Sequence, residues 1–472
     1  MPLNSLVRLL QTTALTGELQ ERSQRPERLL LRGANRAARA LIASALARRA
    51  DQSLLVVVPT LEEAGRWTAL LELMGWPSAQ LYPTSEGSPY EPFDPTTEIT
   101  WGQLQVLSEL QDQCGREGMA IVATERCLQP HLPPPQALAS RCRTVRKGDS
   151  IDLEELALTL SQLGYERVSS IDQEGSWSRR GDIVDIYPVS SELPVRLEFF
   201  GDELDKLREF DPASQRSLDP VEQLRLTPTG FSPLIAEQLR ETMPEGLDQL
   251  LDEEQISALL EGNTPEGMRR LMGLAWPEPA SLLDYLPEQC CVAIDERRHG
   301  KAHGQQWLDH ATEHHSELAL PLPLLHRGIE EAMGLTDVFP GFDLAELHES
   351  DDHLNAFDLA SRPVPAYPNQ FGKLGELLKD YQRERQAVWL VSAQPSRAVA
   401  LLEEHDCISR FVPNAADHQA IARLIEQGTP VALKTKGTAE LEGLQLPAWR
   451  VVLITDREFF GQQNLTSSGY IR

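Results

Sequence analysis

Residues 54–63 read Leu-Leu-Val-Val-Val-Pro-Thr-Leu-Glu-Glu, and they decide the fold class of the first part of the chain. The first five residues are apolar without alternation, which is typical of a strand that is covered on both faces. Thr60 followed by Glu63 has the spacing of a capping box and predicts that a helix begins here and continues to Met74. A buried strand that leads directly into an amphipathic helix indicates a parallel α/β sheet with helices on its faces.

The alternation of apolar strand and helix stops and resumes along the chain. A second apolar run at 119–125 is followed by the proline-rich stretch 129–135, which lacks the N–H groups for regular structure and predicts a domain boundary. The pattern over 142–226 is one helix and several alternating strands, as in an α+β domain. After residue 333, a new α/β block is expected with buried strands at 387–392, 430–434 and 450–456. Residues 462–472 lose the periodicity and indicate a chain that is cut rather than finished.

Composition narrows the function classes. The 472 residues carry 71 acidic and 44 basic side chains, and the net charge of −27 opposes the phosphate backbone, so nucleic-acid binding is disfavoured as the main role. No apolar run is long enough for a signal peptide or a membrane span, and we predict a cytoplasmic protein without membrane contact. Free thiols in a reducing compartment are expected for the six cysteines, which form no C-x-x-C pair: Cys114, Cys127, Cys142, Cys290, Cys291 and Cys407.

Residues 28–42 have the order of a nucleotide-binding strand, turn and helix, with Gly33 where a phosphate-binding loop would begin. Such a loop needs a second glycine, a lysine for the phosphates and a hydroxyl for magnesium. Those three places hold Ala38, Arg39 and Ala40. Asp295 and Glu296 follow a predicted strand and would suit a magnesium-holding acid and a water-orienting base, although such acids are also typical of a solvated helix start. We predict a nucleotide-binding fold that serves as a scaffold, and ATP hydrolysis is the alternative.

The stretch 174–200 reads as two strands joined by a short turn, and its second strand carries a ring on its polar face. Successive side chains point to opposite faces of a strand. The strand therefore divides into an apolar set and a polar set: Val195, Leu197, Phe199, and Arg196, Glu198, Phe200. An exposed aromatic ring beside an arginine is typical of a protein-binding hot spot. The alternative is that Phe200 packs under a neighbouring domain or caps the sheet edge.

Four histidines fall in a predicted helix with two i, i+4 spacings: His299, His303, His310 and His314. Such spacing can place imidazoles on one helix face as metal ligands. No third ligand is well placed in the sequence, and the intervening residues are polar. We therefore predict a solvated helix surface and no metal site.

Several motifs together resemble a known family. They are Tyr90-Glu-Pro-Phe-Asp-Pro95, Gly175-Ser-Trp-Ser-Arg-Arg-Gly-Asp-Ile-Val-Asp-Ile-Tyr-Pro188, residues 193–205, 210–216, 282–287 and 292–296. Their order over the first 300 residues resembles the N-terminal portion of the bacterial transcription-repair-coupling factors, the Mfd family, whose first domains are similar to the excision-repair protein UvrB. Residues 338–459 match less distinctly. The stretch 82–93 is too short and too rich in proline for the DNA-gripping hairpin of UvrB, which favours the coupling factors.

The resemblance implies a fold and a set of partners. The expected fold is α/β and multidomain: a degenerate RecA-like domain of the P-loop NTPase type is split by an inserted α+β UvrA-binding domain and is followed by a second small α/β domain. The expected parts are domain 1a at 1–135, the insert at 136–228, domain 1b at 229–333, a third α/β domain of unknown role at 334–460, and a linker or tail at 461–472. The UvrA-binding surface implied by the resemblance consists of Arg180, Arg196 and Phe200.

The resemblance also implies what the segment does. It would be an adaptor in nucleotide excision repair that recruits UvrA to RNA polymerase stalled at a DNA lesion. In full-length relatives, domains that bind RNA polymerase and translocate on double-stranded DNA with ATP and Mg²⁺ would follow, so no cofactor and no catalytic residue is expected in this segment. One alternative is a UvrB-like ATPase that loads onto damaged DNA. Another is regulation, in which the C-terminal end of the full-length protein covers the same surface of the insert until the motor engages.

Overall fold

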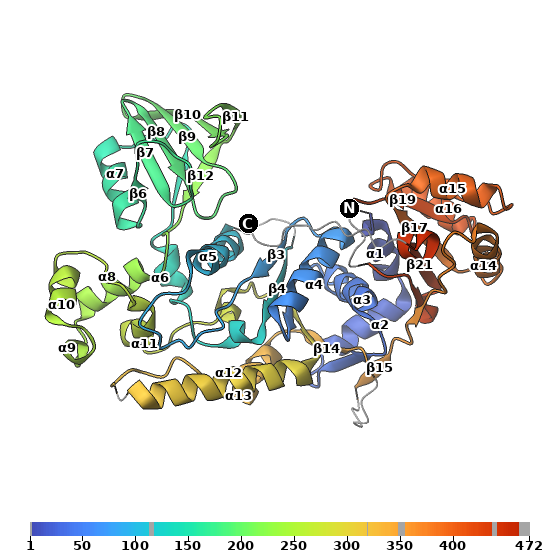
Figure 1. Cartoon of the computed structure of the whole chain (residues 1–472), viewed down its shortest axis with the longest axis horizontal. Helices are drawn as coiled ribbons and strands as arrows, with labels where there is room; N and C mark the ends of the chain where they lie inside the picture. The colour runs from blue at the N-terminus through green and yellow to red at the C-terminus, as the bar shows by residue number, and fades with distance from the viewer. Residues whose placement is uncertain (1, 113–117, 319, 348–354, 437–440, 462–472) are drawn as a thin grey trace.

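The computed structural model describes residues 2–112, 118–318, 320–347, 355–436 and 441–461. Its main feature is a large sheet covered by helices (Figure 1), and this sheet has seven strands. All neighbouring strands of this sheet pair in parallel. Their spatial order is β15 (Ala356–Asp358), β1 (Leu29–Arg32), β14 (Gly341–Ala345), β13 (Cys290–Asp295), β2 (Ser53–Val58), β4 (Ala120–Thr124) and β3 (Ala79–Tyr82). The predicted fold class, an α/β protein with a large parallel sheet, is confirmed.

Both faces of this sheet are covered, as the apolar run at 54–58 predicts. On one face, Leu54, Val56 and Val58 pack against helices from the first 74 residues: α1 (Asn4–Gln11), α2 (Ala14–Ser23), α3 (Arg36–Arg49) and α4 (Leu61–Met74). The alternate residues Leu55 and Val57 pack on the other face, with helices that include α5 (Thr97–Asp112), α8 (Ser232–Thr242), α11 (Met272–Ala275) and α13 (Ile329–Gly334). The helix predicted after β2 begins where expected, because the hydroxyl of Thr60 accepts the N–H of Glu63 at 3.2 Å.

The boundary expected between residues 333 and 334 is wrong. The chain leaves β13 through the long helix α12 (Arg297–Leu318) and α13, and it returns as β14 between β13 and β1. β15 then adds to the free side of β1. The sheet of the first domain therefore continues to Asp358, and the next sheet takes its first strand from β16 (Arg362–Pro363). Short edge strands carry too few apolar residues for their sheet to be identified from periodicity.

The inserted part stands apart from the large sheet (Figure 1) and has its own core. A two-stranded antiparallel ribbon of β5 (Arg143–Arg146) and β12 (Gln223–Leu226) connects it to the rest. Helix α7 (Leu153–Gln162) packs on one face of a six-stranded sheet. The strands of that sheet are, in order, β11 (Ser217–Pro220), β10 (Glu203–Phe210), β9 (Val195–Phe200), β8 (Ile183–Tyr187), β7 (Ser176–Arg180) and β6 (Glu166–Arg167).

The last sheet packs on the N-terminal helices and shares a core with them. The indole of Trp389 donates to the hydroxyl of Ser5 at 3.4 Å, and that of Trp449 donates to Thr16 at 3.0 Å. Its strands are, in order, β16, β20 (Leu444–Leu446), β21 (Val451–Thr455), β17 (Ala387–Ser392), β19 (Val431–Lys434) and β18 (Arg410–Phe411). The apolar runs predicted at 387–392, 430–434 and 450–456 correspond to its three central strands. Helices that include α14 (Phe371–Arg383) and α15 (Pro395–Glu403) pack on its far face.

The structure also describes most of the cysteines and the apolar character of the helices. Five cysteines are free thiols in the structure, whereas Cys114 and all but the first residue of the tail expected at 461–472 lie outside the described residues. Across the described ranges, no helix combines the length and the apolar character that crossing a bilayer would require.

Candidate partner-binding surface

The outer face of the inserted sheet carries the three residues that the resemblance singled out. The predicted division of β9 is confirmed, since Val195, Leu197 and Phe199 are buried in the core under α7. Phe200 points away from that core and is 83% exposed. A ring that remains this exposed to solvent contributes little to the stability of the fold. Because Phe200 is neither under a neighbouring domain nor buried at an edge, the structural alternative for this residue is not supported.

The two arginines meet on one buried carboxylate. Arg196 on β9 donates from Nε and Nη2 to the two oxygens of Asp185 on β8, at 2.7 and 2.9 Å. Arg180 on β7 donates from Nη2 to the same carboxylate at 3.0 Å. Asp185 itself is buried, and it lies directly opposite Arg196 in the strand register. These charge-assisted hydrogen bonds hold both guanidinium groups in fixed positions on the face.

The two arginines differ in what they leave for a partner. The side chain of Arg196 is only 16% exposed, and its guanidinium lies 4.8 Å above the ring of Phe210. The hydrogen bonds that it makes with Asp185 raise its pKa above the ordinary value. The side chain of Arg180 is 59% exposed and makes a single hydrogen bond to Asp185 through one nitrogen. Arg180 therefore presents unused N–H donors to solvent, whereas Arg196 mainly positions the face.

The residue that sequence reasoning missed is Asp185. It is the one acid in a five-residue strand, Ile-Val-Asp-Ile-Tyr, whose last four residues are buried. A buried acid needs a cationic partner, so an unexplained aspartate in such a strand is the signal that could have found it. Ile183 precedes it by two positions, is exposed, and pairs with Glu198 two residues before Phe200. Phe200 and Ile183 therefore lie diagonally across neighbouring strands and form an apolar spot beside Arg180.

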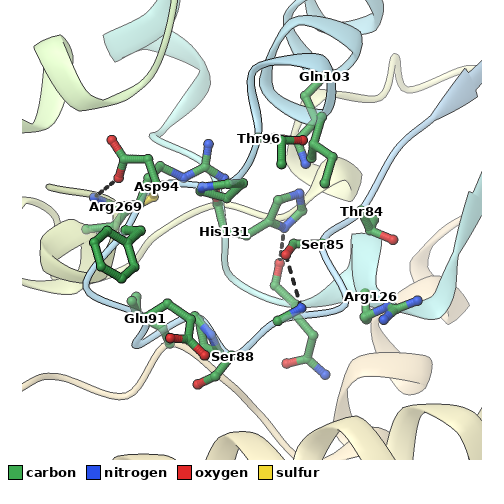
Figure 2. Close-up of a pocket in the computed structure, with 18 of the residues that line it drawn as sticks. Thr84, Ser85, Ser88, Glu91, Asp94, Thr96, Gln103, Arg126, His131 and Arg269 are labelled. Carbon is green, nitrogen blue, oxygen red and sulfur yellow. Dashed lines mark hydrogen bonds between the residues drawn. The ribbon is translucent and has the colours of Figure 1, made fainter. Parts of the chain in front are cut away.

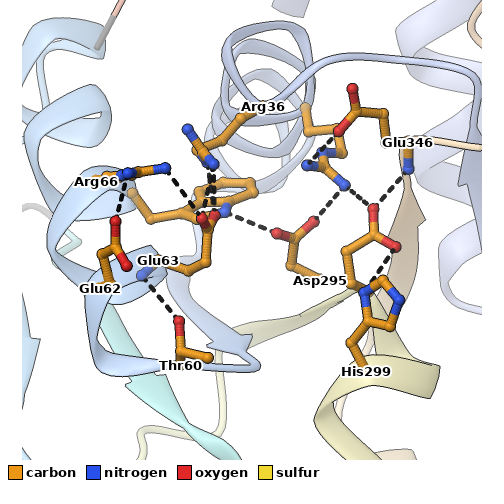
Figure 3. A network of polar contacts seen from close by, with 11 residues as sticks. Arg36, Thr60, Glu62, Glu63, Arg66, Asp295, His299 and Glu346 are labelled. Carbon is orange, nitrogen blue, oxygen red and sulfur yellow. Dashed lines mark hydrogen bonds and ion pairs between the residues drawn. The ribbon is translucent and has the colours of Figure 1, made fainter. Parts of the chain in front are cut away.

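The expected nucleotide site has a different geometry, in which ion pairs join Asp295 and Glu346 to an arginine of the chain (Figure 3). Gly33 directly follows β1 with a φ of 77°, which favours glycine, and α3 carries Ala38, Arg39 and Ala40 inward. The buried guanidinium of Arg39 forms ion pairs with Asp295, at 3.1 Å, and with Glu296. The side chain at the lysine place of a phosphate loop is therefore joined to the acids that would act on magnesium and water.

The acids at the end of β13 are held by further contacts. The indole of Trp67 donates to Asp295 at 2.8 Å, and the backbone N–H of Glu346 donates to Glu296 at 2.7 Å. Burial raises the pKa of Asp295 to about 6, against the lowering effect of Arg39. A solvated helix start does not describe Asp295, because the residue is buried. Among the described residues, the three key places of a phosphate loop hold Ala38, Arg39 and Ala40, so these places offer neither a lysine nor a hydroxyl to a Mg–nucleotide.

The four histidines lie along α12. His299 Nδ1 is 3.9 Å from Glu296, and the rings of His310 and His314 stack with centroids 6.3 Å apart. Within the described ranges, no cluster of three or more His, Cys, Asp or Glu side chains has an arrangement that could hold a metal ion.

Two family models match parts of this chain. Residues 144–230 match the UvrB interaction domain, and residues 363–461 match the Rossmann-like domain of cyanobacterial Mfd. The first match contains the whole outer face with Arg180, Asp185, Arg196 and Phe200. The second covers the last sheet, from β16 to the end of the described residues.

Curated relatives point the same way. The chain is 31% identical over 258 residues to the transcription-repair-coupling factor of Haemophilus influenzae, a match that covers 53% of this chain and 22% of the relative. It is 24% identical over 467 residues to that of Bacillus subtilis, covering 91% of this chain and 38% of the relative. The Escherichia coli factor is 32% identical over 210 residues, 43% of this chain and 18% of the relative. The chain resembles the transcription-repair-coupling factors, as predicted.

The resemblance to the coupling factors is partial in extent. The chain spans 22%, 38% and 18% of the length of these three relatives, so it corresponds to a fraction of a coupling factor. Within that fraction, the UvrB interaction domain is the part whose description names an interaction, and it carries the exposed Phe200. The matched interaction domain therefore contains the outer face with Phe200 and does not contain the interior around Arg39.

Proposed function

We propose that this chain is the UvrA-recruiting segment of a factor for transcription-coupled nucleotide excision repair. The observation that carries the proposal is the fully presented Phe200, fixed beside Arg180 on the outer face of a domain that matches the UvrB interaction domain. Exposed aromatic and arginine residues supply most of the binding energy at protein interfaces. The match to the UvrB interaction domain supports UvrA as the partner, because the resemblance to the coupling factors implies that the inserted domain binds UvrA.

The contacts define how the surface would work. Phe200 would enter an apolar pocket of UvrA, and Ile183 would extend the buried patch. Arg180 would donate its free N–H groups to carboxylates or carbonyls of UvrA. Arg196 would remain with Asp185 and keep the strands and the ring in register. The resemblance implies that both arginines belong to the surface, and this proposal gives them different roles in it.

The remaining functions of the coupling factors would belong to other parts of a full-length protein. We infer that binding of RNA polymerase and ATP-driven translocation on DNA lie outside this segment, which would deliver UvrA to the site where the polymerase has stalled. The ion pairs of Arg39 with Asp295 and Glu296 support the absence of ATP hydrolysis in the segment itself. The competing function is a UvrB-like ATPase that loads onto damaged DNA.

ATP turnover separates these two functions. We expect the chain to release no more phosphate from ATP than its Glu296→Gln variant does, because the place of the phosphate-binding lysine holds a guanidinium paired with two carboxylates. A phosphate-release assay with and without damaged duplex DNA measures this. Turnover that is stimulated by DNA and lost in Glu296→Gln would support the ATPase and contradict the scaffold role.

Binding to UvrA tests the proposed surface. We expect Phe200→Ala to weaken binding by about 2 kcal/mol, the range for a hot-spot residue, with no loss of stability because the ring is exposed. Leu158→Ala is the matched control, since Leu158 is 59% exposed on α7, the helix that packs on the opposite face of the same sheet. Isothermal titration into purified UvrA compares the two. Equal affinities for the two variants would exclude Phe200 as an anchor.

A further inference from the structure

A cavity of about 410 Å³ lies in the first domain (Figure 2). Its wall includes Ser85, which follows β3, and Gln129, which follows β4, so it lies at the carboxyl ends of parallel strands, where α/β sheets commonly bind ligands. Apolar side chains make up much of the rest of the wall: Phe93, Ile99, Met272, Trp307 and Leu325. A mostly apolar cavity of this size fits a small molecule.

The charged side chains of the wall are compensated, with one exception. Arg126 forms an ion pair with Glu86. Burial lowers the pKa of Arg269, and the carboxylate of Asp94, which accepts the backbone N–H of Arg269 at 3.1 Å, acts against this lowering. Burial also lowers the pKa of His131 to about 4, so its imidazole is neutral near pH 7. Neither arginine therefore offers an uncompensated charge to a ligand.

The exception is Glu91, an exposed residue of the same wall. Within the described ranges its carboxylate has neither an ion pair nor a hydrogen bond. Its Cγ lies 3.9 Å from the position that a Cβ on Gly87 would occupy, so the side chain lies against the backbone of this loop. The indole of Trp307 contacts the same residue, because its Nε1 donates to the carbonyl of Gly87 at 3.1 Å. A carboxylate and an indole ring therefore lie close together in the wall.

Phe93 provides a second ring, two residues after Glu91. It lines the cavity and is 71% exposed, so its ring is available to a ligand. The faces of aromatic rings attract cations, and indole does so most strongly. A carboxylate next to two aromatic residues suits a ligand that combines a positive charge with a flat apolar body. An anion would instead meet the carboxylates of Glu91 and Asp94.

We propose that this cavity binds a small arylalkylamine, a molecule in which a short chain joins an aromatic ring to an ammonium group. The ammonium group would pair with Glu91 and lie against the indole of Trp307, and the ring would pack against Phe93 and Met272. Glu91 would supply the selectivity for a cation, and the apolar wall would supply most of the affinity. The site is separate from the proposed UvrA-binding surface and does not depend on it.

The probe is tryptamine, titrated calorimetrically into the intact 472-residue chain, and two analogues with the same ring carry other charges. We expect saturable binding of tryptamine that is about fivefold tighter than binding of the uncharged tryptophol, because an exposed ion pair and a cation–π contact each contribute modestly. The anion indole-3-propionate should bind most weakly of the three. Glu91→Gln should remove the preference for tryptamine over tryptophol. Glu98→Gln is the matched control, because Glu98 is an exposed acid of α5 that does not line the cavity.

A second pair of variants tests the aromatic part of the wall. Phe93→Ala removes an exposed ring at no expected cost in stability and should weaken tryptamine binding several-fold. Leu260→Ala truncates an exposed side chain outside the cavity and should not change it. Binding of indole-3-propionate as tight as that of tryptamine, a preference for tryptamine that persists in Glu91→Gln, or unchanged binding in Phe93→Ala would each overturn the proposal. No binding at millimolar tryptamine would overturn it as well.

Discussion

Replacing Asp185 with alanine is expected to destabilise the inserted domain by about 3 kcal/mol and to abolish detectable binding to UvrA. The carboxylate accepts three hydrogen bonds, two from Arg196 and one from Arg180, and it is buried beneath both. Without this carboxylate, the mostly buried guanidinium of Arg196 lacks a counter-charge. Leaving a buried charge unpaired destabilises a protein by more than the intact ion pair stabilises it. The three central strands then lose the contact that fixes Phe200 relative to Arg180.

Urea denaturation and titration into UvrA measure the two effects of Asp185→Ala. Asp219→Ala is the control, since Asp219 is an exposed residue of β11 in the same sheet and should change stability by less than about 0.5 kcal/mol. A variant at Asp185 that unfolds at the same urea concentration as the parent and binds UvrA equally well would show that the arginines do not depend on this carboxylate.

Replacing Arg39 with alanine is expected to destabilise the first domain by about 3 to 5 kcal/mol. The guanidinium is buried between Asp295 and Glu296, and Asp295 is buried as well, so the alanine variant keeps a buried acid that has lost its cation. The indole of Trp67 would be the remaining donor to Asp295. The urea concentration at half-unfolding, compared between parent and variant, reports the change.

Two further variants identify the origin of that loss. Arg25→Ala removes an exposed arginine that follows α2 and should leave stability within about 0.5 kcal/mol of the parent. In the double variant Arg39→Ala/Asp295→Asn, removal of the stranded charge should recover part of the loss. No recovery in the double variant would mean that the cavity left by Arg39, rather than the unpaired acid, dominates the destabilisation.

The parts of the fold that long apolar patterns describe could be predicted from the sequence. The run at 54–58 and the capped helix after it fixed the expectation of a parallel α/β sheet, and the three central strands of the last sheet lie at the predicted positions. The boundary predicted at residue 334 was wrong, because β14 and β15 belong to the first sheet. They are its fifth and seventh strands, counted from the edge strand β3. Pairing of short strands depends on tertiary contacts that periodicity does not contain.

The candidate site was predictable only in part. Alternation along β9 places Phe200 on the polar face from sequence alone, and the structure agrees. The shared partner of the arginines was not predictable in the same way, because Asp185 becomes their neighbour through the register of three strands.

A titration of the parent chain into purified UvrA at physiological salt, followed by displacement with UvrB, directly tests whether the inserted domain recruits UvrA. We expect saturable binding by the parent and displacement by UvrB, because both proteins would use the same surface of UvrA. We also expect loss of binding in Arg196→Glu, which places a carboxylate against Asp185. No binding by the parent, or binding that neither UvrB nor Arg196→Glu affects, would contradict the assignment of this chain as the segment that recruits UvrA through its inserted domain.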